Sequence, residues 1–182
     1  KKEIVEQILK KSKSSGIFTI ISLIYPAPFE NEKTRKETLE LLERTKPDSA
    51  LIQFPGIYPG TVWFKNPEKF NFELDRDTYP LKVMNYKIKA LFPPRMWQPL
   101  PYKVNGMSFN EFAYETEKFQ NEVKNLDINV SISDDAYLLY KYTEFESLDE
   151  FLKFNRVYFY SGNNKKLEEE IKKINKNSEK LK

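Results

Sequence analysis

Two short apolar runs flank an amphipathic segment, and this order restricts the fold of the N-terminal third of the chain. The runs are residues 17–24 (IFTIISLI) and 50–54 (ALIQF), and both are rich in residues that favour strands. Such runs are typical of strands buried on both faces of a parallel sheet. Residues 32–45 between them predict a helix capped by Asn31, with Leu39 and Leu42 on its buried stripe. The result is a parallel strand–helix–strand unit of right-handed connection.

Other elements are expected from helical spacing and capping residues. Residues 1–14 predict a helix that ends at Gly16, which suits a left-handed C-terminal cap. Residues 128–132 alternate between apolar and polar side chains and predict a short strand. Four further helices are expected: from the cap Ser108 to residue 125, from Ser133 or Asp134 to 142, from Ser147 to 155, and over 165–181.

The middle of the chain lacks a clear period. Eight of the 11 prolines fall between residues 55 and 106, and only residues 87–92 (KIKALF) there are compatible with a strand. We therefore expect three regions: strand–helix units over 1–64, a Pro-rich irregular connection over 65–106 and a mostly helical region over 107–182. A connection of this length is often functional.

The composition excludes several classes of chemistry. The 182 residues contain no Cys and no His, so Ser-His-Asp and Cys-His triads, zinc sites of the usual ligands and a disulfide framework are excluded. The net charge is +3 with the two signs interspersed, which indicates a solvated surface and no nucleic-acid partner. No apolar run is long enough to span a membrane. A soluble, cytoplasmic protein with no membrane partner is expected.

The ends of the two predicted strands resemble segments of the radical S-adenosylmethionine superfamily. Residues 16–30 (GIFTIISLIYPAPFE) are similar to the family's fifth strand, which ends in Gly-x-Ile-x-Gly-x-Pro-Gly-Glu. Ile24, Pro28 and Glu30 match this frame, whereas Ser22, Pro26 and Phe29 replace its glycines. Residues 46–64 resemble the sixth strand and its loop, with the shared triplet Pro59-Gly60-Thr61.

The resemblance implies an α/β fold that forms the C-terminal portion of a partial TIM-like (β/α)6 barrel with a helical extension. The first four strands, and the three cysteines that ligate a 4Fe-4S cluster, would belong to the N-terminal half of the parent chain, which would be the main partner. By itself the Cys-free chain would be inactive. The cofactor S-adenosylmethionine would lie at Ser22, Ile24 and Tyr25, with Ile24 against the adenine and backbone amides near Gln53 and Phe54 reading its edge.

Two later segments resemble the cobalamin-associated branch of the same superfamily. These are residues 97–101 (WQPLP) and 132–135 (ISDD). The resemblance implies an iron–sulfur oxidoreductase or methyltransferase of unknown substrate, with cobalamin as a further cofactor of that branch. The residues after 64 would then shape or cover the substrate opening.

Simpler interpretations stand beside these. Ser22, Ile24 and Tyr25 could be ordinary strand residues, Glu30 a carboxylate at a helix start, and Pro59-Gly60-Thr61 a turn. Gln53 would need a partner if buried, either a ligand or a loop carbonyl. Asp134 and Asp135 favour capping over a catalytic pair, and Trp97 favours a plug over a substrate platform. The alternative function is a non-catalytic α/β domain whose Pro-rich middle binds a peptide or protein.

Overall fold

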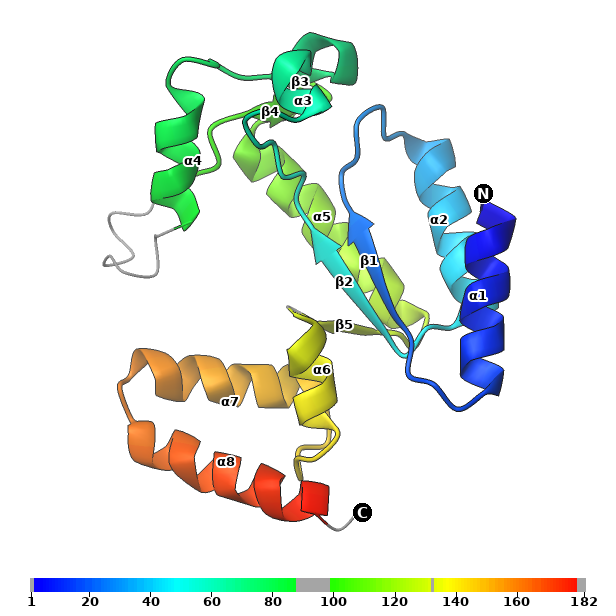
Figure 1. The fold of residues 1–182 in the computed structure, drawn as a ribbon, viewed down its shortest axis with the longest axis vertical. Coiled ribbons are helices and arrows are strands. Elements are labelled where there is room, and N and C mark those ends of the chain that lie inside the picture. The colour runs from blue at the N-terminus through cyan, green and yellow to red at the C-terminus, as the bar shows by residue number, and fades with distance from the viewer. Residues whose placement is uncertain (1, 88–98, 132, 180–182) are drawn as a thin grey trace. The chain divides into compact units, whose positions relative to one another are not determined.

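A computed structural model describes residues 2–87, 99–131 and 133–179, which form helices, one three-stranded sheet and one two-stranded sheet (Figure 1). The fold is mixed α/β, as the sequence predicted. In chain order the elements are α1 (Lys2–Ser14), β1 (Ile20–Ile24), α2 (Glu32–Thr45), β2 (Ser49–Gln53), α3 (Val62–Lys65), the 3₁₀ turn η1 (Pro67–Phe70), β3 (Phe72–Glu73), α4 (Tyr79–Lys87), β4 (Lys103–Val104), α5 (Phe109–Asn125), β5 (Asn129–Ser131), α6 (Asp134–Tyr140), α7 (Leu148–Tyr160) and α8 (Asn164–Glu179).

The main sheet has the strand order β1-β2-β5. β2 and β5 are parallel, with Ser49 opposite Asn129 and Leu51 opposite Ser131. β1 and β2 also run in the same direction, because the Ser49 N–H donates to the Thr19 carbonyl near one end and the Tyr25 N–H to the Gln53 carbonyl at the other. The predicted strand–helix–strand unit is therefore confirmed. The sheet of the described residues has three strands and does not close into a barrel.

The two helices that connect these strands lie next to each other. α2 links β1 to β2, and the last helix before β5 is α5. The Arg35 guanidinium on α2 pairs with the Glu122 carboxylate on α5. α5 also carries Phe119, whose ring stacks on Tyr25 at the end of β1. The two crossover helices thus pack against each other within unit 2.

The chain divides into two compact units. Unit 1 comprises residues 1–21, 46–51 and 127–182, and unit 2 comprises residues 22–45 and 52–126. In unit 1, Tyr137, Leu148 and Phe151 form a small core under α6 and α7. Unit 2 has a larger core that is rich in aromatic rings. Its buried members are Ile57, Phe72, Tyr79, Leu100, Tyr102, Val104 and Phe112.

Residues 65–106 contain more structure than the sequence indicated. α4 and η1 lie here, and β3 pairs antiparallel with β4 in a second sheet that places Phe72 opposite Val104. The hydroxyls of Tyr79 and Tyr102 donate to the Ile57 and Pro55 carbonyls, both at 2.8 Å. These contacts join residues far apart in the sequence, so no local hydrophobic periodicity predicts them. Residues 88–92 of the possible strand, and Trp97, lie outside the described residues.

Most predicted helix boundaries are confirmed because local caps fix them. Gly16 has φ of 73° at the end of α1, and the Asn31 carboxamide oxygen accepts from the Thr34 N–H at 3.1 Å at the start of α2. Ser108 and Glu111 form a capping box at α5, and the Ser147 hydroxyl caps α7. α7 continues to Tyr160, further than expected. Within the part of the chain that the structure describes, no helix combines the length and apolar character needed to cross a membrane.

Candidate functional site

The five residues predicted to bind a cofactor fall on two faces of the sheet. Side chains alternate along a strand, so Ser22 and Ile24 share one face of β1, and Tyr25 points to the other. Ser22 and Gln53 are exposed and Ile24 is 45% exposed, whereas Tyr25 is buried and Phe54 is half-buried. The structure therefore separates Ser22, Ile24 and Gln53 from Tyr25 and Phe54.

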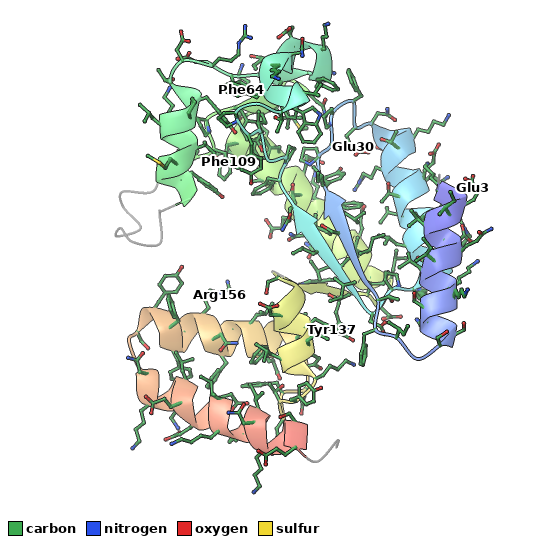
Figure 2. All side chains as sticks on the ribbon, in the orientation of Figure 1. Glu3, Glu30, Phe64, Phe109, Tyr137 and Arg156 are labelled. Carbon is green, nitrogen blue, oxygen red and sulfur yellow. The ribbon has the colours of Figure 1, made fainter. Side chains whose placement is uncertain are left out.

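Tyr25 and Phe54 belong to the core beneath the sheet. The ring of Tyr25 stacks on Phe119 with centroids 4.1 Å apart, and burial raises its pKa to about 12. Phe54 meets Phe112 edge to face, with centroids 5.2 Å apart, and Phe109, labelled in Figure 2 at the start of α5, at 5.8 Å. These two side chains hold the strand ends against α5, and they point away from the exposed face.

Ser22, Ile24 and Gln53 form the open face, a small surface of mixed chemistry at the carboxyl ends of β1 and β2. The Tyr25 N–H donates to the Gln53 carbonyl at 2.9 Å. In a parallel pair this bond places Ile24 beside Gln53. Ser22 lies two residues before Ile24 and therefore on the same face of β1. The carboxamide of Gln53 is exposed, so the expectation of a buried amide in need of a partner does not apply.

The loop after β1 contains a residue with a left-handed backbone conformation. Phe29 has φ of 62°, a conformation that favours glycine. Asn105, in the turn after β4, fixes this loop: its Nδ2 donates to the Ala27 carbonyl at 2.8 Å, and its Oδ1 accepts from the Phe29 N–H at 2.9 Å. The side chain of Asn105 thus compensates for the unfavourable backbone at Phe29.

Replacing Asn105 should loosen this loop. Asn105→Ala removes both hydrogen bonds, so we expect faster amide hydrogen exchange at Phe29 and a loss of about 1 kcal/mol of stability. Asn105→Asp keeps the acceptor for the Phe29 N–H and loses only the donor to Ala27. Exchange measured by NMR should therefore show Phe29 protected in the Asp variant and exposed in the Ala variant. Equal protection in both variants would contradict the anchoring role.

The loop after β2 contains a turn that starts a helix. Gly60 has φ of 89°, the Thr61 N–H donates to the Tyr58 carbonyl at 3.1 Å, and the Thr61 hydroxyl accepts from the Phe64 N–H at 3.3 Å. A Cβ at Gly56 would lie 2.7 Å from a ring carbon of the exposed Tyr58, so a larger residue at this position would require that ring to shift. The turn interpretation of Pro59-Gly60-Thr61 is confirmed.

The acidic candidate Glu30 interacts at the start of α2, and Asp134 and Asp135 are the first two residues of α6. The Glu30 carboxylate, labelled in Figure 2 before α2, accepts from the Thr34 hydroxyl, and the Asn31 N–H donates to that hydroxyl at 3.0 Å. At α6 the cap is the Ser133 hydroxyl, which accepts from the Ala136 N–H at 3.2 Å. Among residues 2–87, 99–131 and 133–179, no three Asp or Glu side chains gather into a group that could hold a metal ion.

Sequence reasoning overlooked Asn105, although a signal was present. Asn105-Gly106 is a turn dipeptide, and both residues have positive φ, 52° and 78°. A turn signal does not reveal which distant loop the Asn side chain will contact. Asn105 lies more than 70 positions from Ala27 in sequence, so only the folded chain shows the pairing.

The open face combines one apolar side chain with two side chains that form hydrogen bonds. Ile24 offers an apolar surface to a flat heterocycle, and the Ser22 hydroxyl and Gln53 carboxamide can donate to and accept from ring or ribose atoms. A 4Fe-4S cluster does not fit this chain, since the sequence has no Cys to ligate it. Comparisons with protein-family models, with curated proteins and with solved structures found no match to this chain.

Proposed function

We propose that this chain is the C-terminal part of a radical S-adenosylmethionine enzyme, in which the open face forms the adenosine-side wall. The observation that carries the proposal is the exposure of Ser22, Ile24 and Gln53 together at the carboxyl ends of parallel strands. Ligands in parallel α/β folds bind at this end of the strands. The positive φ at Phe29, in place of a family glycine, adds support from the loop.

The connectivity supports the same proposal. In a barrel, successive strands are neighbours and the crossover helices cover one face; in a doubly wound sheet, helices cover both faces. β1, β2 and β5 are in sequential order, and α2 and α5 are paired through Arg35 and Glu122. β5 lies beyond the strand that resembles the family's sixth, so the sheet extends one strand further than the resemblance implies.

The chain's own residues would bind and orient the cofactor. When bound, S-adenosylmethionine with a 4Fe-4S cluster held by the N-terminal half supplies the radical chemistry of an oxidoreductase or methyltransferase. Ile24 would pack on the heterocycle, and Ser22 and Gln53 would hydrogen-bond to its polar atoms. The loops after β1 and β2 flank this surface, and the region after residue 64 would cover the substrate. The proposal of cobalamin as a further cofactor depends on the resemblance of residues 97–101 and 132–135, which the structure describes only in part.

The adenosine surface can be tested with S-adenosylhomocysteine as the probe. Ile24→Asp places a charge where the heterocycle would pack, so binding measured by calorimetry should weaken at least tenfold, about 1.4 kcal/mol. Ile4→Asp is the matched control, because Ile4 on α1 is also exposed, at 58%. The control should bind as the unaltered chain does. Equal affinity of the two variants would remove the open face as the site.

The gene upstream of the codon for Lys1 decides between the two functions. An upstream coding sequence in the same reading frame that encodes Cys-x-x-x-Cys-x-x-Cys would support the enzyme function. Reconstitution with iron and sulfide would then be the next step. A frame without this motif would contradict the proposal. The non-catalytic binding domain would then be the better interpretation.

A further inference from the structure

Unit 1 contains a pocket that the proposed function does not use. α6, α7 and α8 line a pocket of about 880 Å³. Ligand sites commonly span roughly 300–1,000 Å³. Most of the wall is apolar or aromatic. Its main members are Leu139, Phe151, Leu152, Phe159, Tyr160 and Ile171.

A buried carboxylate lies in the wall of this pocket. Glu170 on α8 is 6% exposed, and its Oε1 is shielded and has no hydrogen-bond partner among the described residues. Its Oε2 lies 3.5 Å from the Nζ of Lys173, whose side chain is 55% exposed. Lys173 therefore balances the charge from the solvent side and leaves one oxygen unpaired. Buried charges are normally paired, so this oxygen is a position where a ligand cation would be stabilised.

The remaining charges favour a cation. Asp135 lines the same pocket, and Arg156 on α7, labelled in Figure 2, is the one basic residue among the described residues of its wall. Arg156 is exposed, so solvent screens its charge more than the enclosed charge of Glu170. Phe159 and Tyr160 are 68% and 62% exposed and can offer ring faces to an ammonium group.

We infer that this pocket binds a small amphipathic ammonium ion. The charged group pairs with Glu170, and the hydrocarbon body packs on the apolar walls of α6, α7 and α8. The terminal torsion of a Glu side chain is soft, so a small rotation presents Oε1 to the pocket. A neutral or anionic ligand of the same shape fills the walls and leaves the carboxylate without a partner.

The test compares 2-phenylethylammonium with 2-phenylethanol, which has the same ring and chain without the charge. NMR titrations of the whole chain at neutral pH should give at least tenfold tighter binding for the ammonium, with shifts at Leu139, Phe159 and Ile171. Equal affinities would overturn the inference, since the pocket would then be an apolar groove only. Absence of binding by both probes would overturn it as well.

Two variants assign the effect to Glu170. Glu170→Gln keeps the shape and removes the charge, so ammonium binding should fall to the level of the alcohol, and alcohol binding should stay unchanged. Glu168→Gln makes the same change of charge at an exposed position of α8 and should leave both affinities unaltered. A similar loss of ammonium affinity in both variants would contradict the inference, because the net charge of the chain, and not Glu170, would then determine the affinity. If Glu170→Gln does not fold, the comparison of the two probes on the unaltered chain still decides.

Discussion

Phe112→Ala should destabilise unit 2 by about 3–5 kcal/mol, the largest effect that we expect from a single substitution. Phe112 on α5 is 0% exposed. Its ring stacks on Tyr102 at 5.3 Å and meets Phe54 and Phe109 edge to face at 5.2 and 5.3 Å. The cavity left by alanine has three rigid rings around it, so the site cannot easily collapse.

Urea unfolding followed by fluorescence measures this loss. Tyr114→Ala is the control on the same helix, because Tyr114 is 60% exposed and should change stability by less than about 0.5 kcal/mol. The variant should also release Phe54, and with it the end of β2 that carries Gln53. A loss below about 1 kcal/mol in Phe112→Ala would show that the aromatic core of unit 2 is not packed as described.

Unit 2 should lose stability steeply between pH 10 and pH 12. Burial raises the pKa of Tyr79 and of Tyr25 to about 12, and it raises the pKa of Tyr102 in the same direction. An unfolded tyrosine ionises near 10, so the folded state retains protons that the unfolded state has lost. The stabilisation is complete below pH 10 and is lost as pH rises towards 12. The loss should be on the order of 2 kcal/mol for each of Tyr25 and Tyr79.

The slope of stability against pH, obtained from urea unfolding at several pH values, tests this prediction. Tyr79→Phe lacks the ionisable group, so its slope above pH 10 should be smaller, although it loses the hydrogen bond to the Ile57 carbonyl at every pH. Tyr114→Phe, at an exposed position, should keep the slope of the unaltered chain. Comparing slopes cancels the contribution of lysines that titrate in the same range. Identical slopes in both variants would contradict the burial of the Tyr79 hydroxyl.

Local signals in the sequence were sufficient for most elements. Asn31, Ser108, Ser133 and Ser147 each begin the helix that was expected of them, since a cap acts within three residues. The parallel pairing of β1 with β2 followed from two apolar runs separated by a helix. Whether the sheet belongs to a barrel could not be judged in this way, because closure depends on strands that contact one another across long sequence distances.

The candidate site was harder to predict than the fold. In residues 17–24 nearly every side chain is apolar, so there was no alternation to indicate which face helices would cover. Ser22, Ile24 and Tyr25 were therefore grouped by sequence, and the pleat separates Tyr25 from the other two. Glu170 was hidden for a related reason: it belongs to a run of three glutamates, and only packing against α6 and α7 distinguishes it from Glu168 and Glu169.

The division into two units has a consequence for biosynthesis. The chain passes between the units four times, after residues 21, 45, 51 and 126. Neither unit corresponds to one continuous stretch of gene, so neither could be exchanged or acquired as a module by a single recombination event. During translation every residue of unit 2 emerges before residue 127, whereas unit 1 awaits its last segment. The aromatic core of unit 2 can form while the ribosome is still adding the helices that complete unit 1.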